Sequence, residues 1–272
     1  PNPSQTLVHV HPDVGELNRV YQADIAMACA PGIWVRAIEP LSPTATPARV
    51  RRCEALHARR LAWSDPSAIE HPGALQMGRV MAHLNAMLPE DAILTNGAGN
   101  FASWVHRFFR HHGLVKGHKT QLAPTVGSMG YGVPAGIAAN IVTGRTAFTI
   151  AGDGDFLMNG QELATAVQHG GKSIIVLLNN GMYGTIRMHQ EREYPMRVSG
   201  SALSNPDFTA LAQAYGYAGA RIERTADFEP ALLAALARNQ GTVIEVLLDP
   251  EVITTRGTLS SIRKAAINKD SA

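Results

Sequence analysis

The sequence has little cysteine and no long apolar run, and each absence excludes a class of protein. Cys29 and Cys53 are the only cysteines in 272 residues, too few for a disulfide framework, and spacing alone does not show whether they pair. A reduced, cytoplasmic setting is therefore expected. No run of eighteen apolar residues and no basic-then-apolar leader is present, so neither a membrane span nor a signal peptide is predicted. The net charge of +2 gives no reason to expect a nucleic-acid partner.

Acidic residues are absent from the whole interval between Asp91 and Asp153. Within this interval, Gly97 to Ala102 reads Gly-Ala-Gly-Asn-Phe-Ala and fits the G-x-G-x-x-A fingerprint of dinucleotide-binding folds. That fingerprint also needs an acidic residue about twenty positions later, to bind the ribose. Since the interval has none, the sequence argues against an NAD-binding oxidoreductase.

The same interval is rich in basic and histidine side chains: Arg107, Arg110, Lys116, Lys119, Arg145, His106, His111, His112 and His118. A patch of this sign would suit a neighbouring diphosphate or an acidic partner surface, and an ordinary basic surface explains it equally well. A zinc site at His111 and His112 is disfavoured, because no cysteine lies nearby and the spacing is poor.

Two polar motifs, each directly after an apolar strand, are the most informative feature present. A strand predicted over 146–150 leads into Gly152-Asp153-Gly154, and another over 173–178 leads into Asn179-Asn180. Continuous apolar strands are typical of a parallel sheet covered on both faces. With one helix expected between them, roughly Gly160 to His169, they form a right-handed βαβ unit. Both motifs should then emerge at the carboxyl edge of the sheet, where ligands of such sheets bind.

Oxygen ligands on two neighbouring loops suit Mg²⁺, which takes few protein ligands and fills its octahedron with water and phosphate oxygens. Asp153 would supply the charge, Asn180 a neutral carbonyl, and the backbone carbonyl of Met182 a third oxygen. Gly154 and Asp155 would offer backbone N–H groups to a phosphate near the following helix N-terminus. The alternative is a strand-end aspartate and two turn asparagines, which explains either motif alone better than both at this spacing.

Gly-Asp-Gly followed at this distance by Asn-Asn resembles the signature of thiamine-diphosphate-dependent enzymes, in the domain that binds the diphosphate through a divalent metal. The resemblance implies a doubly wound, parallel α/β sheet, which the alternation of strands and helices over residues 70–250 also favours. It implies thiamine diphosphate and Mg²⁺ as cofactors, with Asp153, Asn180 and Met182 on the metal.

Other segments also resemble parts of that cofactor site. The family uses a loop like the one at 97–101 to touch the diphosphate. By resemblance, the Gly127 carbonyl would accept a hydrogen bond from the aminopyrimidine, and Met129 would wedge between the two cofactor rings, unless it is a core methionine in a glycine-rich turn. The resemblance thus assigns cofactor binding to Gly97, Gly99, Asn100, Phe101, Gly127, Met129, Asp153, Gly154, Asp155, Asn180, Met182, Tyr183 and Gly184.

The segment after Asn180 bears on the substrate. Arg187 and His189 could meet a substrate carboxylate, and a solvated helix face is the alternative. Acetolactate synthases usually carry a tryptophan near the position of His189, and this sequence has none there. That departure leaves open whether the chain is closer to acetolactate synthase or to a simple decarboxylase.

The resemblance extends over nearly the whole chain and suggests its division. Residues 1–39 resemble the end of the family's middle α/β domain, which holds FAD in some members, so FAD stays undecided. Residues 40–69 form a linker and a helix, 70–250 the diphosphate-binding domain, and 251–272 the tail of acetolactate synthase-like members. The start at Pro1 suggests a fragment or a processed product. Naturally split enzymes exist in the family, but the middle-domain remnant at 1–39 favours a truncated long chain.

The expected function is the cofactor-binding portion of a 2-oxo acid decarboxylase or carboligase resembling acetolactate synthase. The alternatives are a simple decarboxylase of the benzoylformate or pyruvate type, and a non-catalytic dimerisation module that kept the fold. Family members take an activating glutamate from the pyrimidine-binding domain of a partner subunit. This chain alone is therefore expected to be inactive, and the full-length protein to be a homodimer or homotetramer.

Overall fold

The computed structural model describes residues 4–41, 45–111, 117 and 120–270. The chain divides into two units, Pro1–Arg59 and Arg60–Ala272, and the division falls inside helix α2 (Pro47–Trp63). The finer division at residues 39, 69 and 250 stays a prediction. Four residues of the basic interval lie outside the described residues: His112, Lys116, His118 and Lys119.

The smaller unit pairs two parallel strands with a helix: β1 (Val8–His11), β2 (Ile25–Ala28) and α1 (Pro31–Ile38). Between the strands, Asp13 caps a single 3-10 turn, η1 (Val14–Glu16), and its Oδ1 accepts a hydrogen bond from the Gly15 N–H at 2.8 Å. The turn stops before Asn18, which has a left-handed φ of 63° that a helix cannot continue through.

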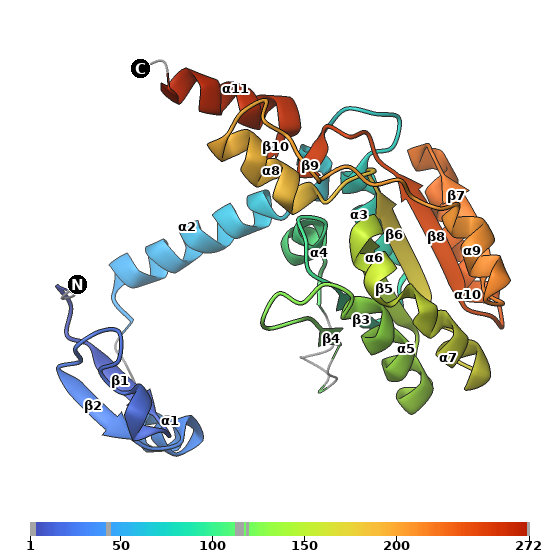
Figure 1. Cartoon of the computed structure of the whole chain (residues 1–272). Helices are drawn as coiled ribbons and strands as arrows, with labels where there is room; N and C mark the ends of the chain where they lie inside the picture. The colour runs from blue at the N-terminus through green and yellow to red at the C-terminus, as the bar shows by residue number, and fades with distance from the viewer. Residues whose placement is uncertain (1–3, 42–44, 112–116, 118–119, 271–272) are drawn as a thin grey trace. The chain divides into compact units, whose positions relative to one another are not determined.

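The larger unit is built on six strands: β3 (Ile93–Asn96), β4 (Gln121–Leu122), β5 (Ala147–Gly152), β6 (Ile174–Asn179), β7 (Ala218–Ile222) and β8 (Thr242–Leu247). Their order in the sheet is β4-β3-β5-β6-β8-β7, and every neighbouring pair is parallel. The predicted doubly wound α/β sheet is therefore confirmed (Figure 1).

Strand β6 shows why this sheet needs helices on both faces. Its side chains alternate between two cores: Ile174, Val176 and Leu178 enter one, and Ile175 and Leu177 enter the other. Burying each such side chain contributes about 1.5–3 kcal/mol, so a strand apolar at every position must be covered twice. The first core is closed by α3 (Met77–Met87), α4 (Ala102–Phe108) and α10 (Phe228–Ala237); the second by α5 (Gly132–Thr143), α7 (Leu163–Gln168) and α9 (Phe208–Ala214).

The connection between β5 and β6 corrects one prediction. Instead of a single helix over Gly160 to His169, the chain forms α6 (Asp153–Asn159), a 3-10 turn (Gly160–Glu162) and then α7. Gly152 is extended and ends the strand, and the carboxylates of Asp153 and Asp155 lie in the first helical turn, where the helix dipole favours negative charge. The Gly-Asp-Gly motif is thus the start of a helix rather than a loop that precedes one.

The strand order also locates a crevice. From β3 the chain moves outward to β4 and then returns to form β5 on the other side of β3. Loops that leave β3 and β5 therefore diverge toward opposite faces at the carboxyl edge. Such a switch point is where ligands of open α/β sheets bind.

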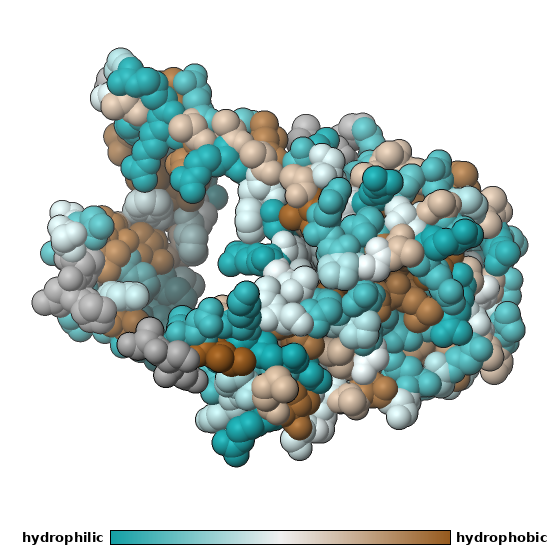
Figure 2. All heavy atoms as spheres, turned by 90° about the horizontal axis from the view of Figure 1, so that it is seen from above, coloured by the Kyte–Doolittle hydropathy of each residue, from teal (hydrophilic) through white to brown (hydrophobic). Residues whose placement is uncertain are grey.

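Past β8 the chain forms three further elements: β9 (Val252–Thr254), β10 (Gly257–Thr258) and α11 (Leu259–Asp270). Another helix, α8 (Gly184–Glu193), follows β6. Helix α11 packs on α8. On the face that Figure 2 presents, hydrophilic side chains cover most of the larger unit, with hydrophobic ones interspersed. Among the described residues no helix combines the length and apolarity that a membrane crossing requires.

Candidate functional site

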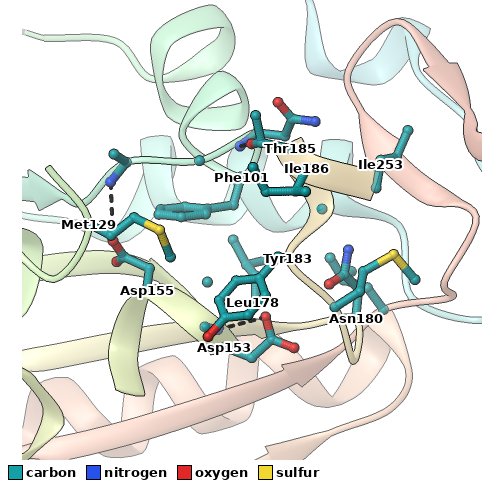
Figure 3. Close-up of a pocket in the computed structure, with 18 of the residues that line it drawn as sticks. Phe101, Met129, Asp153, Asp155, Leu178, Asn180, Tyr183, Thr185, Ile186 and Ile253 are labelled. Atoms are coloured by element: carbon teal, nitrogen blue, oxygen red, sulfur yellow. Dashed lines mark hydrogen bonds between the residues drawn. The ribbon is translucent and has the colours of Figure 1, made fainter. Parts of the chain in front are cut away.

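A cavity of about 230 Å³ lies at the carboxyl ends of β3, β5 and β6 (Figure 3). Every residue assigned to the cofactor from the sequence lines it except Gly97. Gly97 lies directly behind the wall, because a Cβ at this position would collide with the carboxylate of Asp155. Four segments distant in the sequence therefore converge on one cavity: 97–101, 127–129, 153–155 and 180–184.

Aromatic rings explain both glycines of the Gly-Asp-Gly motif. A Cβ on Gly152 would lie 2.7 Å from Cδ1 of Phe101, and one on Gly154 would lie 2.5 Å from Cε1 of Tyr183. Real Cβ atoms do not approach carbon so closely, since close-packed interiors leave no room for the extra atom. Figure 3 shows the rings of Phe101 and Tyr183 beside the cavity, with Asp153 next to Tyr183.

Asp153 is held firmly at the floor of the cavity. Its side chain belongs to a residue only 3% exposed, Oδ1 accepts from the Gly154 N–H at 2.9 Å, and Oδ2 accepts from the Gly181 N–H at 2.9 Å and from Asn205 Nδ2 at 2.8 Å. Burial raises the pKa of Asp153, and these donors partly offset that rise. A bound cation would favour the charged form further.

The Gly154 N–H therefore donates to Asp153 instead of facing the cavity as expected from the sequence. Of the two amides assigned to a phosphate, only that of Asp155 is left for this purpose.

The loop after β6 is fixed by a short antiparallel bridge between Met182 and Ala202. The flanking bonds, Tyr183 N–H to the Ser201 carbonyl and Leu203 N–H to the Gly181 carbonyl, are both 2.9 Å. In this pattern the N–H and C=O of Met182 point away from Ala202. Within the described part of the chain the Met182 carbonyl accepts no hydrogen bond, so its oxygen is available to a ligand.

The oxygen atoms around the cavity fit the ligand preferences of Mg²⁺. Asp153 offers a carboxylate, Asn180 a side-chain amide, and Met182 an uncommitted backbone carbonyl, and all three line the same cavity. The described residues contain no group of three or more His, Cys, Asp or Glu suited to a metal, which is unfavourable for zinc but compatible with an ion that prefers one carboxylate, neutral oxygens and phosphate.

Asp155 braces the walls of the cavity. It is 2% exposed, and its Oδ1 accepts from the Ala98 N–H at 3.1 Å and from the Gly130 N–H at 2.8 Å, so it joins α6 to the loops after β3 and before α5 (Figure 3). Burial raises the pKa of Asp155 to about 6. Its Oδ2 is buried and has no hydrogen-bond partner among the described residues.

The remaining walls come from predicted and unpredicted residues. Gly127 has a φ of +70°, which favours glycine, and Met129 extends its thioether beside Phe101 (Figure 3). The Asn100 N–H donates to Thr185 Oγ1 at 3.0 Å and so joins the loop after β3 to α8. The apolar lining also includes side chains that sequence reasoning missed: Trp104, Leu178, Ile186, Leu248, Val252 and Ile253.

The basic interval does not act as one patch. The guanidinium of Arg107 stacks on the Trp63 ring at 3.4 Å and donates to the Trp63 carbonyl at 2.8 Å, while Arg145 pairs with Asp91. Neither arginine lines the cavity. The described part of this interval therefore shows arginines engaged by the protein itself.

His189 agrees with the predicted solvated helix face, whereas Arg187 is neither solvated nor at the cavity. Arg187 pairs with the fully buried Glu191 at 3.0 Å, and Arg263 of α11 binds the same carboxylate through Nε at 2.7 Å and Nη2 at 2.6 Å. These bonds hold the pKa of Glu191 near 2, with Arg263 as the largest cause. Arg187 is thus part of an ion cluster, and His189 is exposed on α8.

Sequence reasoning missed Asn205, which donates to both Asp153 and Asn179. The local sequence Asn205-Pro206-Asp207 is typical of a helix start, and Asp207 does cap α9 by accepting from the N–H groups of Thr209 and Ala210. Nothing in the local pattern shows that a helix-capping segment also reaches the end of β5.

The class of the larger unit follows from these features. In its parallel sheet, a hydrogen-bonded carboxylate follows β5, an amide follows β6, and both line one cavity, as in α/β cofactor-binding domains. Comparison with known proteins identifies the family. Residues 97–246 match the family model described as thiamine pyrophosphate enzyme, C-terminal TPP binding domain. The chain belongs to this family; thiamine pyrophosphate is another name for thiamine diphosphate.

Curated relatives of the chain point to the same family. The chain is 31% identical over 254 residues to the acetolactate synthase large subunit of Parasynechococcus marenigrum, covering 90% of this chain and 39% of that protein. It is 28% identical over 251 residues to the acetolactate synthase isozyme 2 large subunit of Escherichia coli, covering 91% and 44%. A putative thiamine pyrophosphate-containing protein of Bacillus subtilis, YdaP, is 30% identical over 183 residues, covering 65% and 30%. The chain therefore spans about two fifths of the length of the first two relatives.

Proposed function

We propose that the cavity binds thiamine diphosphate through Mg²⁺, and that the chain is the cofactor-binding portion of a 2-oxo acid decarboxylase or carboligase resembling acetolactate synthase. The observation that carries the proposal is the convergence of Asp153, Asn180 and Met182 on one cavity at the switch point of the sheet. The family and the acetolactate synthase relatives support it.

In this proposal the protein supplies the metal ligands from one helix start and one loop. Asp153 contributes charge, Asn180 an amide oxygen and Met182 its free carbonyl. The bonds from Gly181 and Asn205 keep the Asp153 carboxylate in place before the ion arrives, so little reorganisation accompanies binding. In this proposal the Asp155 N–H and Gly99, Asn100 and Phe101 contact the diphosphate, and Gly97 supports their loop from behind the wall.

The organic part of the cofactor would occupy the apolar walls. Met129 is unbranched and polarizable, which suits contact with irregular ring surfaces, and Gly127 places a backbone carbonyl at the same wall. Tyr183 and Gly184 close the side next to α8. When bound, the cofactor supplies a thiazolium carbon nucleophile and an electron sink for cleavage beside a carbonyl. The chain's residues bind and orient it and keep water from the apolar side.

The substrate and the partner follow from the relatives and remain part of the proposal. A 2-oxo acid is the substrate class, and a pyrimidine-binding domain of a partner subunit supplies the activating glutamate in a homodimer or homotetramer. The 272-residue chain alone is accordingly expected to bind the cofactor weakly and to show essentially no turnover.

Calorimetric titration with thiamine diphosphate tests this proposal. With Mg²⁺ present, we expect saturable binding that chelation of the metal by EDTA abolishes, because the diphosphate is held mainly through the ion. Adding the upstream half of the protein should strengthen binding and allow consumption of pyruvate. If no heat of binding is detected, either for the chain alone or together with the upstream half, the proposal is refuted and a non-catalytic module is favoured.

A further inference from the structure

A chain of hydrogen-bonded polar side chains, three buried and Asn205 half-buried, connects the proposed metal site to a neighbouring strand. Asn205 Nδ2 donates to Asp153 Oδ2 at 2.8 Å and to Asn179 Oδ1 at 2.9 Å. Asn179 Nδ2 in turn donates to Glu245 Oε1 at 2.7 Å. The Gly181 N–H also bridges Asp153 Oδ2 and Asn179 Oδ1, at 2.9 and 3.1 Å. Four elements thus contribute: α6, β6, β8 and the segment before α9.

The groups that accept these hydrogen bonds determine which way each asparagine amide is turned. An ionised carboxylate only accepts, so Glu245 requires Asn179 to present its amide nitrogen. The Asn179 oxygen then faces Asn205 and Gly181. With two acceptors before it, Asn205 must present its own nitrogen. Glu245 and the Gly181 N–H thus fix the orientation of the Asn179 amide, and Asp153 and Asn179 fix that of Asn205, although Glu245 does not line the cavity.

The position of Glu245 is unusual for a residue with only a packing role. It is fully buried on strand β8, and its Oε2 has no hydrogen bond among the described residues, with Arg221 Nε 3.5 Å away. Burying a carboxylate is unfavourable, and apolar replacement of buried ionic groups often stabilises a protein. What this buried carboxylate gains in return is the ion pair with Arg221 and the hydrogen bond from Asn179.

Asn205 carries a second unusual feature. Its Oδ1 is buried and accepts no hydrogen bond within the described residues. A buried acceptor is expected to have a donor. Mg²⁺ keeps several of its waters in protein sites, and such a water is a donor that the chain itself does not supply.

We propose that Glu245, Asn179 and Asn205 form a hydrogen-bond relay that positions the Asp153 carboxylate and the Gly181 loop for the metal. The metal part of this inference rests on the proposed function, and the positioning part does not. Asn205 and Glu245 are positioning residues, since they act through Asp153.

The test compares Asn205→Ala with Asn85→Ala in the 272-residue chain. Asn85 is a matched control, because it also joins separate segments, donating to the Phe108 carbonyl and accepting from the Arg110 N–H, both at 2.9 Å, away from the cavity. Without any ligand, Asn205→Ala should accelerate amide hydrogen exchange at Gly181 about tenfold relative to the control. With thiamine diphosphate present, it should weaken Mg²⁺ binding about 10–100-fold, as loss of a supporting residue around a metal site typically does.

Glu245→Leu provides a readout that a purely structural role would not move. This variant should lower the urea midpoint, because Arg221 loses its ion pair and Asn179 loses its acceptor. It should also weaken Mg²⁺ binding about tenfold, because the Asn179 amide is held less firmly, whereas Asn85→Ala, which also loses buried hydrogen bonds, should leave Mg²⁺ binding unchanged. Equal Gly181 exchange in Asn205→Ala and Asn85→Ala would overturn the relay. If wild type binds no Mg²⁺ with the cofactor but Gly181 exchange still responds to Asn205→Ala, the proposed function fails and the positioning role stands.

Discussion

Asp153→Asn is expected to weaken Mg²⁺-dependent binding of thiamine diphosphate by about 100-fold or more. The substitution keeps the shape of the side chain but removes the only negative charge proposed to contact the ion. It also places an amide N–H₂ against groups that are all donors, namely the N–H groups of Gly154 and Gly181 and the Asn205 amide. One donor is then left unpaired, which costs about 1–3 kcal/mol, and relief of the buried charge offsets part of that cost. The chain should therefore remain folded.

Calorimetry measures the affinity, and urea unfolding separates it from stability. Asp91→Asn is a suitable control, because Asp91 pairs with Arg145 away from the cavity. That variant should bind as wild type does. An Asp153→Asn protein that binds cofactor and Mg²⁺ as tightly as wild type would show that Asp153 is not a metal ligand.

Glu191→Ala is expected to lower the free energy of unfolding by roughly 2–3 kcal/mol, because it leaves two arginines without their shared carboxylate. Arg187 lies on the same helix and Arg263 on α11, and their side chains are only 20% and 26% exposed. Glu191 Oε2 also accepts from the N–H of Met196, a residue with a left-handed φ of 67°. Urea unfolding compares this variant with Glu193→Ala, an exposed neighbour that should change stability by less than about 0.5 kcal/mol.

The same carboxylate predicts a dependence on pH. Its pKa falls from 4.5 to about 2 on folding, so its stabilising contribution is complete above about 4.5 and is lost as the pH falls toward 2. The difference in unfolding free energy between wild type and Glu191→Gln should therefore shrink by about 1 kcal/mol between pH 6 and pH 3.5. A difference that stays constant, or grows on acidification, would contradict the ion cluster.

Much of the cofactor cavity could be predicted because its signals are local. Each motif follows directly after an apolar strand, and parallel topology brings strand ends to one edge, so the sequence alone predicts that Asp153 and Asn180 lie together. Glycines within the motifs are also a local signal. Gly127 permits a left-handed turn, and Gly152 leaves room for the Phe101 ring.

The rest depended on contacts between distant segments. Asn205 lies 52 residues from Asp153, and its position reads as an ordinary helix start. The start of α6 at Asp153 was not predicted, because alternating glycine and aspartate is typical of a turn. In the structure the helix dipole instead favours the carboxylates of Asp153 and Asp155 in the first helical turn. Arg187 resembled a substrate ligand because nothing near it in sequence shows that α11 brings Arg263 to Glu191.

The most direct test of the metal site is a crystal of the chain grown with thiamine diphosphate and Mn²⁺, examined by anomalous scattering. One Mn²⁺ peak is expected, bonded to a carboxylate oxygen of Asp153, the side-chain oxygen of Asn180 and the backbone oxygen of Met182, with the remaining positions taken by diphosphate and water. A peak elsewhere, or a cofactor-filled cavity in which Asp153 and Asn180 are too far apart to share one ion, would contradict the account.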